Sequence, residues 1–136
     1  MDYSVAAVKM YVTHLKPAKP AKELTSNGGS AFAIGSLIFQ RVWLQGVLVQ
    51  ESENTSLSLQ DGTGVLPLQI GQEALKPGMY VLVVGAYLLG ADGSPYLLVH
   101  KIVDLSSNPD RDTFWRLEVA EIHKLFYDKL MNASTH

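Results

Sequence analysis

Short apolar runs separated by turn residues are the feature that most constrains this fold. Between residues 42 and 105 the sequence has five such runs, at 42–50, 55–60, 65–70, 79–89 and 95–105. The segments 61–64 (DGTG) and 92–93 (DG) separate neighbouring runs and consist of residues that tight turns favour. Runs of this length, bounded in this way, are typical of β-strands. The pattern therefore predicts an all-β barrel or sandwich.

A small closed barrel explains the details of these runs better than an open sheet does. Gly46 lies in the middle of the first run, where it would let a strand bend to serve two sides of a barrel. The run at 79–89 is apolar on both faces, so its outer face also needs a cover. We predict an OB-fold, which is a five-stranded Greek-key barrel, over residues 32–136.

Residues 1–31 are predicted to be an N-terminal extension of this domain. Residues 3–15 could form a short helix with Val5, Val8, Val12 and Leu15 on one stripe. The following segment is rich in Pro, Lys, Ala and Gly, and its two prolines forbid a continuous helix. We therefore expect a flexible linker between the short helix and the barrel.

A helix over about residues 110–130 ends the predicted domain, because this segment contains neither Gly nor Pro. Its apolar residues recur at steps of three and four and form one stripe: Trp115, Val119, Ile122, Phe126 and Leu130. Phe114, Leu117 and Leu125 widen that stripe on one side. One stripe is enough to cover the barrel, so the surplus width predicts a second surface that a partner buries.

Composition excludes several classes of function. The formal net charge of -2 offers no general attraction for nucleic acid, and the absence of cysteine removes disulfides and thiolate sites. No apolar run is long enough to cross a membrane. The four histidines, at 14, 100, 123 and 136, lack metal-ligand spacing, and no carboxylate pair or nucleophile with its base is recognisable. We predict no catalytic, cofactor or metal site, and hence no enzyme.

Several segments resemble one family closely. VWLQGVLV, the LQDGTG turn, KPGMYVLVVGAY and KIVDLSSNPDRDTFWRLEVAEIH look like the RecQ-mediated genome instability protein 2 family, and the likeness covers about residues 41–125. The resemblance implies a non-catalytic nuclear scaffold in a genome-maintenance complex. Its implied partners are a larger OB-fold subunit similar to RecQ-mediated genome instability protein 1 and, through it, a RecQ helicase and topoisomerase III. The implied role is double Holliday junction dissolution and control of homologous recombination.

The same resemblance implies which residues meet a partner. Lys9, Trp43, Lys101 and Trp115 match positions that the family presents at partner surfaces, and Val119, Ile122 and Phe126 join them from the helical stripe. Lys101 also stands on an otherwise apolar strand face, where its ammonium could pair with a partner's carboxylate. A lysine that extends its charge into solvent from an apolar surface is the alternative interpretation.

Two further alternatives stay open. OB-folds can bind single-stranded DNA by stacking bases on aromatic side chains, and Trp43, Tyr80, Tyr87 and Tyr96 are candidates. However, Lys76 is the only basic Lys or Arg between residues 42 and 100, so we expect DNA binding by the chain alone to be weak or absent. The isolated chain could also form a homodimer through its helix when the partner is missing.

Overall fold

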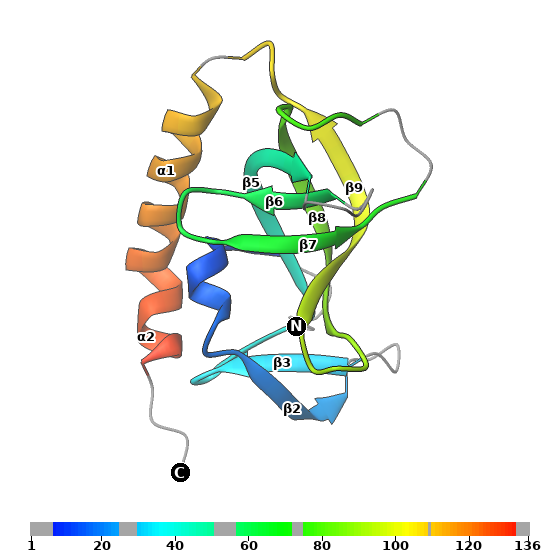
Figure 1. Ribbon diagram of the computed structural model, residues 1–136. Helices are drawn as coiled ribbons and strands as arrows, with labels where there is room; N and C mark the ends of the chain where they lie inside the picture. Colours follow the sequence, from blue (N-terminus) through cyan, green and yellow to red (C-terminus); the bar gives the residue numbers. More distant parts are fainter. Residues whose placement is uncertain (1–6, 25–29, 51–56, 72–74, 109, 133–136) are drawn as a thin grey trace.

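The structure is a computed structural model that describes residues 7–24, 30–50, 57–71, 75–108 and 110–132. Five strands form a closed barrel: β5 (Arg41–Gln50), β6 (Leu57–Gln60), β7 (Val65–Gln69), β8 (Tyr80–Leu89) and β9 (Pro95–Asp104). Antiparallel pairs join β5 to β6, β6 to β7, β8 to β9 and β5 to β8, and a parallel pair joins β7 to β9. This closure confirms the predicted OB-fold (Figure 1).

The N-terminal region differs from the prediction. Instead of a helix over 3–15, the described part contains the short strand β1 (Val8–Lys9) and the 3-10 helix η1 (Val12–Leu15), while residues 1–6 lie outside the described residues. β1 pairs in parallel with β5, which places Val8 opposite Val42. β-branched residues favour an extended backbone, and this pairing outweighs the weak helical stripe.

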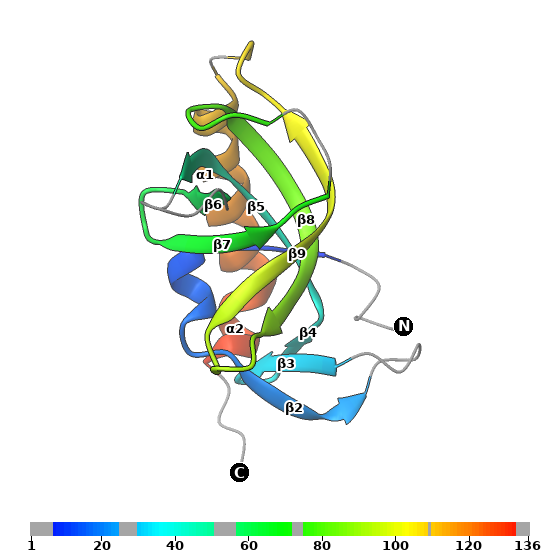
Figure 2. The same ribbon diagram turned by 45° about the vertical axis from the view of Figure 1, so that its right-hand side comes forward.

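The predicted flexible linker is wrong for residues 19–24. These residues form β2 (Lys19–Leu24), which pairs with β3 (Ser30–Ile34) and through it with β4 (Leu37–Phe39). Pro20 is tolerated because β2 is an edge strand of this sheet. Figure 2 shows the second sheet at one end of the barrel.

One hydrophobic core unites the parts that were predicted as extension and barrel. Val12 and Leu15 of η1 belong to the same buried cluster as the barrel residues Leu44 and Leu97. Phe32 of the second sheet meets Tyr87 of β8 edge to face, with 5.0 Å between ring centroids. Residues on both sides of the predicted boundary at 31/32 therefore share one core, and the boundary itself stays a prediction.

The predicted C-terminal helix is present, but it contains a wide turn. It consists of α1 (Arg111–Ile122), the π-helical turn η2 (His123–Tyr127) and α2 (Asp128–Met131). A π-helical turn needs more residues than an α-helical turn, so it rotates everything that follows around the helix axis. The residues that face the barrel therefore recur every four positions: Trp115, Val119, His123, Tyr127 and Met131.

The far end of this helix is fixed to the turn between β3 and β4. The backbone N–H of Ser36 donates to the Leu130 carbonyl at 2.7 Å, which satisfies a group that a helix end leaves free. Gly35 adopts φ +59, and a Cβ at this position would collide with the carbonyls of Leu130 and Met131. Within the described residues, no helix is long and apolar enough to span a membrane.

Candidate protein-interaction surface

A row of four side chains crosses the outer face of the sheet. The strand registers pair Lys9 with Trp43, Trp43 with Val84, and Val84 with Lys101. Aligned positions on neighbouring strands point to the same face. The inner positions on either side, such as Val42 and Val83, belong to the barrel core, so this row faces outward. Three of the predicted partner residues are therefore brought together by strand pairing.

Trp115 of α1 brings the C-terminal helix into contact with this row of side chains. Its ring stacks on Trp43, with 6.3 Å between centroids and 24° between planes, and Trp115 is only 2% exposed. Val119 is buried one helical turn further on. Both residues lie within the chain's own helix–sheet junction, where they hold the helix against the sheet.

Lys9 connects β1 to the helix through its side chain and its backbone. Its Nζ lies 4.7 Å from the centre of the Trp43 ring and 3.3 Å from Oε2 of Glu118. Its backbone N–H donates to the Tyr127 hydroxyl at 3.4 Å, and its carbonyl accepts from His123 Nε2 at 2.9 Å. The ammonium therefore already has an anion and an aromatic face within the chain.

The first turn of the helix is fixed to the sheet by a polar cluster. The Tyr80 hydroxyl lies 3.2 Å from Oδ1 of Asp112 and 3.3 Å from Oε1 of Gln45. Arg116 Nε donates to the other oxygen of Asp112 at 3.1 Å. Burial, with a smaller contribution from the Asp112 carboxylate, raises the pKa of Tyr80 well above its usual value. The hydroxyl thus stays protonated and remains a donor.

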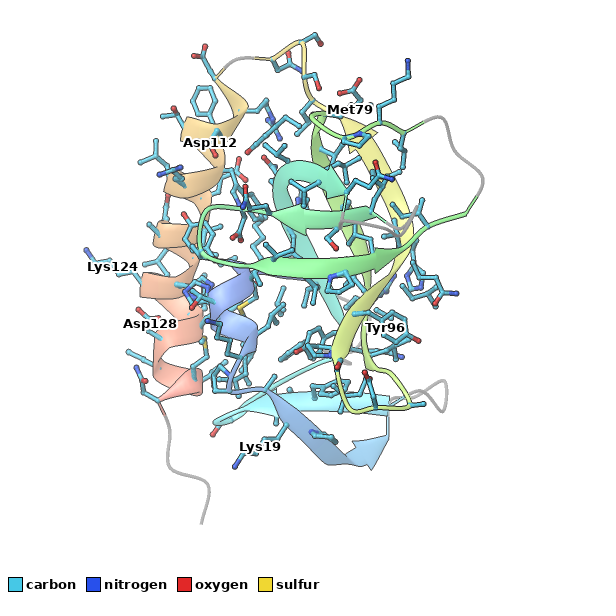
Figure 3. The ribbon with its side chains drawn as sticks, in the orientation of Figure 1. Lys19, Met79, Tyr96, Asp112, Lys124 and Asp128 are labelled. Atoms are coloured by element: carbon cyan, nitrogen blue, oxygen red, sulfur yellow. The ribbon has the colours of Figure 1, made fainter. Side chains whose placement is uncertain are left out.

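The opposite side of the helix exposes several large apolar side chains, which we call the outer helix face. Figure 3 shows Lys124 on this helix pointing away from the barrel. The members of the outer helix face are far more exposed than the core residues of this chain: Phe114 53%, Leu117 61%, Leu125 55%, Phe126 60% and Leu130 40%. Large apolar side chains gathered in this way commonly mark a protein interface.

The π-helical turn decides which predicted residues belong to this face. The sequence places Phe126 on the same stripe as Trp115, but the wide turn at His123–Tyr127 brings Tyr127 toward the barrel and leaves Phe126 outside. Ile122 is half-buried at the boundary and lines a small hollow with Lys9 and Phe126. Sequence reasoning missed His123, Tyr127 and Met131 as inner residues, although their four-residue spacing from Val119 was a usable signal.

Lys101 lies at the uncovered end of the row. Its side chain is exposed, and its neighbours on the outer face are the half-buried Val84 and Val103, which is 36% exposed. The structure thus places a cation beside apolar surface. Whether it pairs with a partner's carboxylate stays a prediction.

Two histidines that are distant in the sequence stack on each other between η1 and the helix. The rings of His14 and His123 lie 4.2 Å apart, and Tyr11 stacks on the His14 ring at 5.3 Å. The Tyr11 backbone N–H donates to His14 Nδ1 at 3.0 Å, so this nitrogen must be unprotonated. Burial, and then the neighbouring His123, lower the pKa of His14, while Asp128 and Asp61 oppose that shift.

This contact predicts a loss of stability in acid. Because the pKa of His14 is lower in the folded chain than its usual 6.5, the unfolded chain binds more protons once the pH falls below about that value. The free energy of unfolding, measured by urea denaturation, should therefore fall between pH 7.5 and pH 5.5. A His14→Phe variant keeps an aromatic ring but cannot titrate, so its decrease should be smaller. An equal decrease in both proteins would contradict this role of His14.

The described residues present neither a metal site nor, among the four aromatic candidates, an open platform for stacking bases. Within the described residues, no group of three or more His, Asp or Glu side chains could hold a metal ion. Of the aromatic candidates for base stacking, Tyr87 is buried, Trp43 lies beneath Trp115 and Lys9, and Tyr80 and Tyr96 are half-buried. None of these four rings is therefore presented as a fully exposed platform.

Comparisons with known proteins agree on one family. A family model described as RecQ-mediated genome instability protein 2 matches residues 6–123. Proteins of that name from Gallus gallus and Bos taurus are 34% and 32% identical over 97 residues, covering 65% and 67% of this chain. The protein of that name from Mus musculus is 33% identical over 89 residues and 61% of the chain. The matches span 70%, 60% and 58% of the three relatives, so less than two thirds of the bovine and mouse proteins is covered.

Solved structures show the same fold at low sequence identity. A chain of a replication protein A heterotrimer bound to single-stranded DNA has a TM-score of 0.67 and 16% identity, and the match covers 88% of this chain and 97% of that one. A chain of the Schizosaccharomyces pombe Stn1–Ten1 complex reaches 0.55 at 14% identity, covering 71% and 79%. The telomere capping protein Ten1 from Schizosaccharomyces pombe reaches 0.52 at 17% identity, covering 88% and 99%.

Proposed function

Because the chain belongs to the RecQ-mediated genome instability protein 2 family, we propose that it is a non-catalytic scaffold subunit of a nuclear genome-maintenance complex. Its direct partner in this proposal is a larger OB-fold subunit, similar to RecQ-mediated genome instability protein 1, and through it the chain supports a RecQ helicase and topoisomerase III. The complex would dissolve double Holliday junctions and so control homologous recombination.

The outer helix face is the observation that carries this proposal. A helix that only covered its own barrel would need one apolar side, yet this helix also exposes Phe114, Leu117 and Phe126 to more than half of their full extent. A few large side chains that become buried near the centre of a protein interface supply most of its binding energy. We therefore assign direct contact with the larger subunit to this face.

The predicted partner residues divide into two roles in this proposal. Phe126 and Ile122 would contact the larger subunit, and Lys101 would pair with a carboxylate at the rim of the interface. Trp115, Val119 and Trp43 would hold the helix at the correct place on the sheet, since they are stacked or buried against one another. Lys9 would do both, because it is bound to Glu118 and also lines the hollow beside Phe126.

Structural relatives support an assembly role in general terms. The matched structures are named as a replication protein A heterotrimer and a Stn1–Ten1 complex, so this fold occurs in multi-subunit assemblies on DNA or at telomeres. That context also supports a nuclear location. The outward positions of β7, which are Val65, Pro67 and Gln69, are uncharged, which favours a protein partner over single-stranded DNA on that strand.

Co-purification with the larger OB-fold subunit tests the proposal. We expect Leu117→Asp to weaken pairing by about thirtyfold or more, because a carboxylate in an apolar interface is left without a partner. Leu117 is 61% exposed, so the change should leave the free energy of unfolding of this chain nearly unaltered.

Leu89→Asp is the matched control, since Leu89 is also exposed, at 41%, but lies in β8 away from the helix. It should co-purify like the unaltered chain. Undiminished pairing of Leu117→Asp and of a second variant, Phe126→Asp, would show that the outer helix face is not the docking surface. Light scattering on the same samples shows whether the isolated chain forms a homodimer and whether Leu117→Asp abolishes it.

A further inference from the structure

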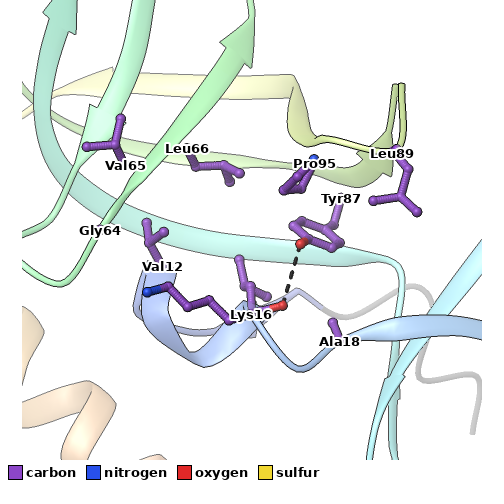
Figure 4. A pocket seen from close by; sticks show the side chains of 11 residues that line it. Val12, Lys16, Ala18, Gly64, Val65, Leu66, Tyr87, Leu89 and Pro95 are labelled. Carbon is purple, nitrogen blue, oxygen red and sulfur yellow. Dashed lines mark hydrogen bonds between the residues drawn. The ribbon is translucent and has the colours of Figure 1, made fainter. Parts of the chain in front are cut away.

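A second hollow, lined mostly by apolar side chains, lies between η1 and the rim of the barrel. Its volume is about 500 Å³, which is within the range of sites that bind small ligands or peptide side chains. One wall consists of Val12, Leu15 and Lys16, and the other is formed by the start of β7 and the hairpin between β8 and β9 (Figure 4). We call it the η1 groove.

The η1 groove is separate from the proposed partner surface. Tyr11 and His14 contribute to the polar and aromatic contacts between η1 and the C-terminal helix, whereas Val12 and Leu15 line the groove. Figure 4 shows η1 between the groove and the helix. A molecule in the groove would therefore leave the outer helix face free.

Exposed apolar side chains at the rim leave part of this groove uncovered. Val65 of β7 is 42% exposed and Leu89 of β8 is 41% exposed, and both line the groove. The Tyr87 ring lies between the walls, with its hydroxyl donating to the Leu15 carbonyl at 3.5 Å. The hydrogen bond from Tyr87 to Leu15 thus joins the two walls of the groove, while Val65 and Leu89 at its rim remain exposed to solvent.

The barrel strands that border the groove are incompletely paired there. β7 begins at Val65 and β9 at Pro95, yet the parallel register between them contains only Leu68 with Leu97 and Gln69 with Leu98. The preceding residues of the two strands, all within the described part of the chain, are not paired in this register. An unpaired strand edge beside an apolar groove suits an extended peptide, which can add main-chain hydrogen bonds to side-chain contacts.

The charge of Lys16 indicates which kind of ligand the groove would bind. Lys16 is the only charged residue among those that line the groove, and its side chain is exposed. A cation at the edge of an otherwise uncharged groove favours a ligand that combines apolar side chains with a carboxylate. We propose that the η1 groove binds an extended peptide segment with apolar side chains and an acidic residue that pairs with Lys16.

Selection from a displayed library of random octapeptides, with the full chain as target and the Leu89→Asp variant as counter-target, tests this proposal. We expect the enriched peptides to combine apolar residues with Asp or Glu. In solution, the best of them should bind Lys16→Glu about fivefold more weakly than the unaltered chain, as for a partly exposed ion pair. Replacing its acidic residue by lysine should restore binding to Lys16→Glu.

Lys19→Glu is the matched control, because Lys19 is exposed three residues further on and does not line the groove. It should bind the peptide as the unaltered chain does, and so should Leu117→Asp, whose defect is confined to the outer helix face. The proposal is overturned if no peptide is enriched, if Lys16→Glu and Lys19→Glu weaken binding equally, or if sodium dodecanoate binds while every peptide fails.

Discussion

Replacing Trp115 by alanine is expected to lower the free energy of unfolding by about 3 to 5 kcal/mol, as is typical for the loss of a buried tryptophan. Trp115 is 2% exposed, and its ring stacks on Trp43 at the centre of the helix–sheet junction. The cavity that remains could not close easily, because the helix is also held at both ends, by Asp112 near Tyr80 and by the contact of Leu130 with Ser36.

Urea denaturation of the isolated chain measures this loss, and Phe114→Ala provides the control. Phe114 precedes Trp115 in the same helix but is 53% exposed, so its removal should change the free energy of unfolding by no more than about 0.5 kcal/mol. A loss below about 1 kcal/mol for Trp115→Ala would contradict the packing described for the junction. Folded chains that still fail to bind the larger subunit would instead indicate that Trp115 contacts the partner.

Comparison of Trp115→Ala with Leu117→Asp separates the two roles proposed for the helix, which are its placement on the sheet and its contact with the partner. Trp115→Ala should reduce pairing only as far as it releases the helix from the sheet, so added denaturant should weaken its pairing disproportionately. Leu117→Asp should reduce pairing in a chain that is otherwise as stable as the unaltered one. Identical dependence of pairing on denaturant in both variants would argue against a positioning role for Trp115.

Replacing Gly85 by alanine is expected to lower the free energy of unfolding by about 3 kcal/mol, near the upper end for overpacked positions. A Cβ at this position would collide with the carbonyl oxygen of Leu98 and would lie 3.0 Å from the Cα of Val99. Both belong to the backbone of β9, where the register with β8 shifts between Val84 and Gly85. The collision cannot be relieved by turning a side chain.

Gly71→Ala is the matched control for this prediction. A Cβ on Gly71 would meet nothing within 4 Å, so the change should alter the free energy of unfolding by about 0.5 kcal/mol or less. Urea denaturation of both variants makes the comparison. Equal stability of the Gly85→Ala and Gly71→Ala proteins would show that β8 and β9 do not approach each other as closely as described.

The sequence predicted the barrel correctly because its signals are local. The alternating run before 61–64 (DGTG) and the run after it form β6 and β7, and the turn residues at 92–93 lie between β8 and β9. Each strand could be recognised from its own residues. The requirement for glycine at position 85 could not be recognised in this way. It arises because a Cβ there would collide with a carbonyl of the neighbouring strand β9.

The N-terminal region forms structure that its local composition does not predict. Residues 19–24 have the composition of a linker, yet they form β2 because β3 supplies a pairing partner and because an edge position tolerates Pro20. Lys9, Trp43 and Lys101 could be named from the family resemblance alone. That Lys9, Trp43, Val84 and Lys101 stand in one row depends on strand registers that no local pattern contains.

The amino-acid sequence alone determined that this chain forms a five-stranded barrel with a C-terminal helix whose apolar residues exceed the need of one surface, since both properties follow from the spacing of apolar residues along the chain. Only the tertiary structure decided which of those residues turn inward. The π-helical turn at His123–Tyr127 assigns Tyr127 to the barrel and Phe126 to the outer helix face. Residues of this turn contact Lys9 of β1 and His14 of η1, and no local pattern contains contacts between residues that are more than a hundred positions apart.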